Sequence, residues 1–182
     1  MIYQPSDDSH LLEKQISKYA NGKSCLDMGS GSGILAESCM KARASSVTVV
    51  DISPKVIEYI KAKFNDDKIK IVKSNLFSKI KGRFDLIIFN PPYLPLDSRE
   101  DKKSRLATTG GKKGDELIQR FLKQAQIHMH SDSVILLLLS SLTPRKRIIN
   151  LLSQQNLSYK SIAKKKLFQE TLEVWEIQHN NQ

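Results

Sequence analysis

The feature that most constrains the fold is a regular alternation of short β-rich runs with helical stretches. Strands are expected at residues 25–28, 46–50, 69–72, 84–89 and 134–139. Helices are expected at residues 9–19, 34–42, 54–64, 115–128 and 144–155. This alternation is typical of a doubly wound α/β sheet whose parallel strands are joined by right-handed crossovers.

The chain ends on two further β-rich runs, at residues 157–168 and 172–177, with no room for a helix between them. Strands joined by so short a connection pair antiparallel. We therefore predict a Rossmann-like, doubly wound sheet of seven strands, mostly parallel with an antiparallel C-terminal strand. A chain of 182 residues is also one domain's worth, so residues 1–182 are expected to form a single domain.

Composition excludes several classes of protein. A hydrophobic content of 40% supports a packed core and argues against a disordered chain. The longest aliphatic run, residues 134–139, is far below the roughly 20 residues that cross a bilayer, so no membrane span is expected. The first residues show no basic start, apolar stretch or cleavage site of a secretory signal, which makes the cytoplasm the expected location.

The formal charge of +10 is concentrated toward the C-terminus, because residues 141–168 contain seven Lys or Arg and no acidic residue. This asymmetry favours a negatively charged neighbour such as RNA, DNA or a ribonucleoprotein, the alternative being a lysine-rich solvated surface. Cys25 and Cys39 form no metal-binding or disulfide pattern, so neither a metal site nor a disulfide framework is expected. The four histidines lie outside the motifs below and are expected at the surface.

A glycine-rich turn follows the first expected strand, with Gly29, Gly31 and Gly33 in Gly-x-Gly-x-Gly spacing. Glycine permits unusual dihedrals and close approach of a ligand to the backbone. Asp51 ends the next strand, where a carboxylate can accept both hydroxyls of a ribose, and Asp27 suits a cationic amino-acid end. We therefore expect a nucleoside ligand. The alternative is a plain glycine turn followed by an aspartate that caps the next helix.

A second motif, Asn90-Pro91-Pro92-Tyr93, closes the fourth expected strand. The Asn90 side-chain oxygen and the Pro91 carbonyl can accept both hydrogens of a planar NH2 group, and they can support positive charge developing on its nitrogen. Tyr93 offers a flat face for stacking. The structural alternative is a proline-stiffened loop.

The segment after this motif, residues 94–113, lacks apolar periodicity and contains two adjacent glycines near its end. Long irregular segments in compact domains are commonly functional. We expect a substrate-gated lid with Gly110 and Gly111 as its hinge.

Together these motifs resemble the class I S-adenosylmethionine methyltransferases. Within them the chain is similar to the HemK family of protein glutamine methyltransferases, in the short form found among archaeal and eukaryotic release factor glutamine methyltransferases. Residues 3–9 resemble the family's Tyr-x-Pro-x-Glu-Asp-Thr opening. Residues 109–116, followed by Arg120-Phe121-Leu122, resemble its Gly-Gly-x-x-Gly-x-Glu and Arg-Phe-Leu signatures.

The resemblance implies a set of site residues. Asn90, Pro91 and Tyr93 would be catalytic, and no metal is implied. Asn75 stands where many relatives carry an acidic residue, and it could still offer adenine a donor and an acceptor. S-adenosylmethionine would be bound by Asp8, Ser9, Asp27, Gly29, Gly31, Asp51, Ile52, Asn75, Leu76 and Asn90.

The resemblance also implies a substrate and partners. The methyl acceptor would be the glutamine of a Gly-Gly-Gln tip in a translation release factor, and some relatives use a small zinc-binding activator subunit. The basic C-terminal third would then face an acidic partner, ribosomal RNA or the ribosome. Three alternatives remain: an adenine N6 methyltransferase acting on flipped or single-stranded DNA or RNA, a protein lysine methyltransferase, and a methyl-donor-binding scaffold without activity.

Overall fold

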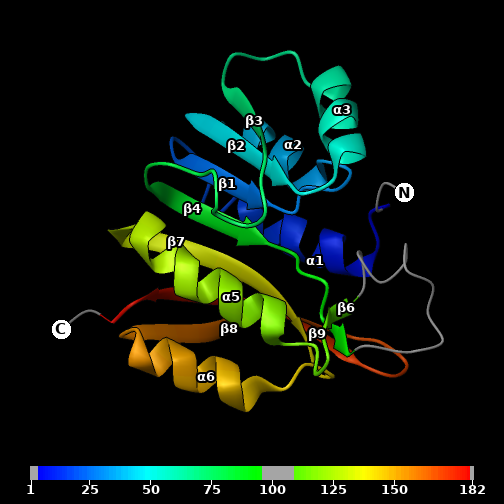
Figure 1. Cartoon of the computed structure of the whole chain (residues 1–182), viewed down its shortest axis with the longest axis vertical. Coiled ribbons are helices and arrows are strands. Elements are labelled where there is room, and N and C mark those ends of the chain that lie inside the picture. Colours follow the sequence, from blue (N-terminus) through cyan, green and yellow to red (C-terminus); the bar gives the residue numbers. More distant parts are fainter. Residues whose placement is uncertain (1–3, 96–108, 181–182) are drawn as a thin grey trace.

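The computed structural model describes residues 4–95 and 109–180, and the strands of these residues build a seven-stranded sheet in the order β3-β2-β1-β4-β7-β9-β8 (Figure 1). The predicted fold class is confirmed. The sheet strands are β1 (Ser24–Met28), β2 (Ser46–Asp51), β3 (Ile69–Lys73), β4 (Phe84–Phe89), β7 (Met129–Ser140), β8 (Leu157–Lys166) and β9 (Thr171–His179).

Strand direction divides the sheet into two parts. The neighbours from β3 to β7 all pair in parallel, whereas β9 pairs antiparallel with both β7 and β8. The predicted hairpin of the last two strands is therefore present. Its second strand, β9, lies inside the sheet, and β8 forms the outer edge.

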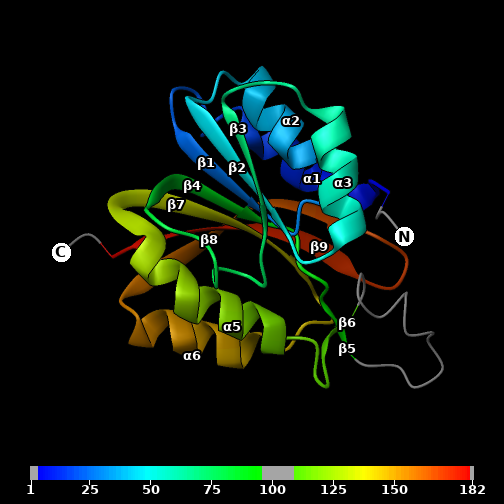
Figure 2. The same cartoon turned by 45° about the horizontal axis from the view of Figure 1, so that its top comes forward.

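The helices are sorted onto the two faces of the sheet (Figure 2). One face is covered by α1, α2 and α3, and the other by α5 and α6. Each face of the sheet has its own hydrophobic core, and successive side chains of β4 point alternately into the two. Ile87 and Phe89 lie on the α5 face, and Leu86 and Ile88 lie on the α1 face. The helix bounds are α1 (Asp7–Ile16), α2 (Ile34–Lys41), α3 (Pro54–Lys63), α5 (Glu116–Ala125) with the 3-10 turn η1 (Gln126–His128), and α6 (Arg145–Gln154).

Two features differ from the sequence-based expectations. A small parallel pair, β5 (Leu94–Pro95) with β6 (Thr109–Gly111), lies at the two ends of the segment expected to be irregular. Residues 96–108 of the expected lid lie outside the described residues. His128 is buried rather than exposed, because its ring stacks on Phe77 and its Nδ1 lies 2.7 Å from the Gly82 carbonyl oxygen.

Two features are absent from residues 4–95 and 109–180. No helix there has the length and apolar character to cross a membrane. The same residues contain no group of three or more His, Cys, Asp or Glu side chains placed to hold a metal ion.

Candidate active site

The motifs meet at one edge of the sheet because β1, β2, β3 and β4 run in parallel and end side by side. Met28, the last residue of β1, is in register with Val50 of β2 and Phe89 of β4. The glycine turn, Asp51 and Asn90 therefore leave three neighbouring strands at the same edge. Ligands of open α/β sheets bind at this carboxyl edge.

The glycine turn adopts backbone geometry that excludes most side chains. Gly29, Gly31 and Gly33 all have positive φ angles, of 68°, 52° and 77°. A Cβ atom on Gly33 would stand 2.6 Å from the Ile60 side chain, so the turn also packs closely on α3. The turn is anchored to β2, since Gly29 N donates to the Val50 carbonyl oxygen over 2.7 Å. The backbone of the turn, of which Gly29 is exposed, is thus held in one conformation.

Asp51 connects this turn to the end of β2. Its carboxylate accepts hydrogen bonds from Gly31 N over 3.2 Å and from Ser53 N over 2.8 Å. Burial raises the pKa of Asp51 above its usual value, and these backbone donors oppose the rise. Each oxygen keeps a further lone pair, so the carboxylate can still accept two hydroxyl groups. Ser53 caps α3, which removes the need for Asp51 as the cap.

Asp27 is fully buried in β1, and neither of its carboxylate oxygens accepts a hydrogen bond from any described residue. Burial raises the pKa of Asp27 to about 7, and the nearby charge of Asp51 adds to the rise. A buried carboxylate without a partner is costly unless a cation or donor joins it. Asp27 is therefore suited to a cationic ligand group.

Asn90 is oriented by the first turn of α1, from the other end of the sequence. Its Nδ2 donates to Ser9 Oγ over 3.4 Å, and Ser9 Oγ donates in turn to Asp8 Oδ1 over 3.2 Å. Asn90 Oδ1 is buried and has no hydrogen-bond partner among the described residues. An amide held through its nitrogen presents its oxygen as a free acceptor. Asp8 and Ser9 are both buried, and this contact places Ser9 beside the Asn90-Pro91-Pro92-Tyr93 motif.

The rest of the Asn90 motif packs against the core on the α1 face and against β6. Pro91 is buried, and Tyr93 packs against the core on the α1 face. A Cβ atom on Gly110 would stand 2.6 Å from the Pro92 carbonyl oxygen and 2.3 Å from that of Gly114. Gly110 therefore allows β6 to approach the motif closely, a packing role distinct from the hinge that the sequence suggested.

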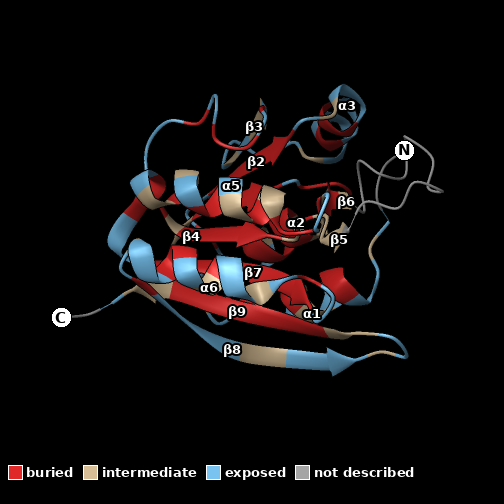
Figure 3. Cartoon of the chain, turned by 60° about the horizontal axis from the view of Figure 1, so that its bottom comes forward, coloured by how far each residue is buried: buried red, intermediate tan, exposed pale blue. Residues whose placement is uncertain are grey.

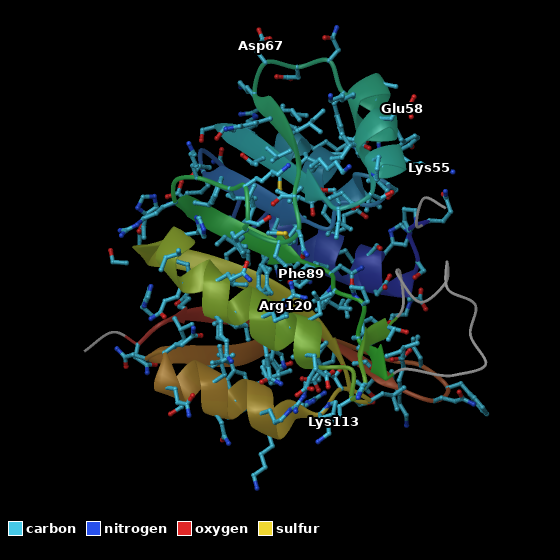
Figure 4. The ribbon with its side chains drawn as sticks, in the orientation of Figure 1. Lys55, Glu58, Asp67, Phe89, Lys113 and Arg120 are labelled. Atoms are coloured by element: carbon cyan, nitrogen blue, oxygen red, sulfur yellow. The ribbon has the colours of Figure 1, made fainter. Side chains whose placement is uncertain are left out.

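The expected adenine-side residues follow β2 and β3. Ile52 is 56% exposed directly after Asp51, and Leu76 is buried with a positive φ of 49°. Asn75 is exposed, and its side-chain oxygen accepts a hydrogen bond from Arg120 Nη2 over 3.3 Å. Sequence reasoning assigned no site role to Arg120. Figure 4 shows Arg120 on α5, and the next residue of that helix, Phe121, has its ring centroid 4.4 Å from that of Phe89, which ends β4.

The chain is similar in sequence to proteins of known family. The family described as Methyltransferase small domain matches residues 6–169. A protein of Methanocaldococcus jannaschii, provisionally named a protein N5-glutamine methyltransferase, is 38% identical over 153 residues, which span 82% of this chain and 77% of that protein. The release factor glutamine methyltransferase of Aquifex aeolicus is 30% identical over 123 residues, or 61% of this chain, and this match spans 44% of the relative.

A solved structure shares the fold over nearly the whole chain. It is the E. cuniculi Mtq2–Trm112 complex, described as responsible for methylation of the translation termination factor eRF1. The alignment has a TM-score of 0.77 at 22% identity and covers 98% of both chains.

Proposed function

The chain belongs to the Methyltransferase small domain family of S-adenosylmethionine-dependent enzymes, and from this premise we propose that it methylates the side-chain amide nitrogen of a glutamine in a translation release factor. The observation that carries the proposal is the buried, unpartnered Oδ1 of Asn90, which its Ser9 contact leaves free to accept from an amide N–H. We treat residues 1–182 as one methyltransferase domain acting in the cytoplasm, where release factors work.

The described residues fit the methyl donor. The unpartnered carboxylate of Asp27 would pair with the cationic amino-acid end, and Asp51 would accept the ribose hydroxyls. Gly29 is exposed and Gly31 is buried against Asp51, so the turn brings backbone without side chains beside these carboxylates, while Ile52 and Asn75 follow the neighbouring strands. When bound, S-adenosylmethionine supplies a methyl group on a positively charged sulfur.

The chemistry required of the protein is positioning and charge stabilisation. The lone pair of an amide nitrogen is delocalised into its carbonyl, so the nitrogen must be aligned and its developing positive charge supported. Asn90 Oδ1 and the Pro91 carbonyl would accept its two N–H groups. The new nitrogen–carbon bond would form as the sulfur–methyl bond breaks, the electron pair of that bond would stay on the sulfur, which becomes neutral, and one proton would leave the nitrogen for solvent. Tyr93 would stack on the planar amide.

The substrate and activator are inferred from the relatives. The release factor glutamine methyltransferase of Aquifex aeolicus and the Mtq2–Trm112 complex both concern translation termination factors by their names. We propose the glutamine of a Gly-Gly-Gln tip as acceptor, and a small zinc-binding subunit as activator. Contact with nucleic acid or the ribosome through the basic C-terminal third belongs to the same proposal.

The test is methyl transfer from labelled donor to a release factor from the same cell, with and without the candidate activator. We expect labelling of the wild-type factor and none of a factor whose Gly-Gly-Gln glutamine is replaced by Ala. Nucleic acid and lysine peptides serve as competing acceptors. Labelling of adenine or lysine in place of the glutamine would contradict the assignment.

An Asn90→Ala variant tests the catalytic residue. Loss of one preorganised contact to the transition state costs about 2.7–4 kcal/mol, or about 100-fold to 1000-fold in kcat. Donor affinity should stay nearly unchanged when measured by calorimetry. Wild-type turnover by Asn90→Ala would remove Asn90 from the mechanism.

A further inference from the structure

The turn between β8 and β9 lies at the same edge of the sheet as Asn90. Because β9 runs antiparallel, its first residues stand beside the last residues of β7 and β8. Leu172 is in register with Ser140 of β7 and with Lys165 of β8. Figures 1 and 2 both show this turn on the side of the molecule that carries β5 and β6.

Hydrogen bonds connect this turn to the catalytic motif. Ser141 N donates to the Thr171 carbonyl oxygen over 2.8 Å, and Thr171 N donates to Ser141 Oγ over 2.9 Å. Ser141 belongs to the turn that follows β7. Two residues farther along that turn, Thr143 Oγ1 donates to the Tyr93 carbonyl oxygen over 3.4 Å. The start of β9, the turn after β7 and the Asn90 motif are thus joined through described contacts.

Two large apolar side chains are exposed on these joined segments. Phe168, in the β8–β9 turn, is 99% exposed, and Leu142, in the turn after β7, is 47% exposed. Leu139 and Leu172, at the adjoining strand ends, are buried. Figure 3 shows the end of β8 that leads into the turn as exposed, in contrast to the buried β9 beside it. Isolated exposed apolar residues are ordinary, but these two lie on segments that hydrogen bonds between Ser141 and Thr171 hold together at the carboxyl edge.

Three consecutive lysines precede Phe168. Lys164 lies 3.5 Å from the Glu173 carboxylate and Lys165 lies 2.7 Å from Asp7, whereas Lys166 has no ion pair among the described residues. We call Leu142, Phe168 and these three lysines the hairpin patch. Its charge is positive but largely compensated within the chain, which fits a few carboxylates better than a run of phosphates.

We infer that the hairpin patch docks the protein substrate, by receiving an apolar side chain that is flanked by acidic residues. The inference rests on the proposed function and adds a second contact at a distance from the methyl-accepting glutamine. A protein whose glutamine reaches Asn90 must approach the carboxyl edge, and the hairpin patch is fixed to that edge through Thr143 and Ser141. A docking contact of this kind lowers the KM for the whole substrate and leaves the chemical step unchanged.

The experiment compares steady-state methylation of the intact release factor by the wild type and two patch variants. Phe168→Ala removes the apolar anchor, and Lys166→Glu reverses the unpaired charge. Each should raise the KM for the factor about 10-fold, equivalent to about 1.4 kcal/mol, with kcat unchanged. Added salt should raise the wild-type KM and affect Lys166→Glu less.

Matched controls lie at the opposite edge of the sheet. Ile127→Ala removes a side chain that is 71% exposed just before β7, and Lys81→Glu reverses an exposed charge just before β4. Both controls should keep the wild-type KM. Donor affinity, measured by calorimetry, should be the same in all five proteins and shows that each is folded.

The outcomes separate the two proposals. If the wild type methylates the factor and the patch variants match its KM, the docking assignment is wrong while the proposed function stands. If the wild type methylates no glutamine of the factor, the proposed function fails and the docking assignment with it. An unchanged KM together with loss of binding to a fluorescent single-stranded RNA would identify the hairpin patch as a nucleic-acid surface and overturn protein docking.

Discussion

Ser9→Ala is expected to slow methyl transfer without weakening donor binding. Ser9 Oγ accepts from Asn90 Nδ2 and thereby decides which end of the amide is free. Without the hydroxyl, the Asn90 side chain can turn over and direct its NH2 group at the substrate, which then meets a donor where it needs an acceptor. A neutral hydrogen bond contributes about 0.5–1.5 kcal/mol, and a contact of 3.4 Å belongs in the lower part of that range. We therefore expect kcat to fall about 2-fold to 5-fold.

The assay is single-turnover methylation of the release factor, with donor affinity measured separately by calorimetry. Ser9→Thr keeps a hydroxyl at the same position and should restore kcat to within about 2-fold of the wild type. In an Asn90→Ala background, Ser9→Ala should cause no additional loss, because the side chain that it orients is gone.

Three results would refute this reasoning. Wild-type turnover by Ser9→Ala would show that the contact does not orient the amide. An equal loss in the Asn90→Ala background would show that Ser9 acts by another route. A large drop in donor affinity with unchanged kcat would instead assign Ser9 to the donor site, which is the role that family resemblance implied.

The other predictions concern the donor site and its support. Asp51→Ala should weaken donor binding about 10-fold to 150-fold, because a charge-assisted contact worth about 1.5–3 kcal/mol is lost, and unchanged binding by calorimetry would contradict the ribose assignment. Asp27→Asn should stabilise the ligand-free protein, and this gain should grow from about pH 4 to pH 7 and then level off. The reason is that burial raises the pKa of Asp27 from 3.8 to about 7. Between these two pH values the folded wild type keeps a proton on Asp27 that the unfolded chain has released, so the folded state loses stability as the pH rises through this window. The gain has an upper limit of about 4 kcal/mol, and a pH-independent difference in thermal unfolding would show that Asp27 is already ionised. Gly110→Ala should lower the melting temperature and kcat together, because its Cβ would stand 2.6 Å from the Pro92 carbonyl oxygen. Such overpacking costs about 1–3 kcal/mol, and a variant that melts and turns over as the wild type does would contradict the close packing of β6.

Local sequence was sufficient to predict the order of the strands and helices. Hydrophobic periodicity and punctuation by glycine and proline act within a few residues, which is why β4 was predicted at its observed bounds, Phe84–Phe89. The glycine turn and Asp51 were also predictable as neighbours, because consecutive parallel strands end at one edge of the sheet. The β5–β6 pair was not, since its two short strands are separated by residues 96–108 and carry no periodic pattern.

Tertiary structure decided which distant groups meet. Asn90 and Ser9 are 81 residues apart, and no local pattern indicates that one orients the other. The basic C-terminal third shows the same limit: residues 141–168 contain no acid, yet Arg147 pairs with buried Asp115 and Arg145 pairs with Glu173. A charge count from the sequence does not show which basic side chains are paired. In the folded chain, acidic residues of other elements form ion pairs with them. A sequence can thus predict which residues can do the chemistry, but the orientation and net charge around them depend on contacts that form only when the sheet is assembled.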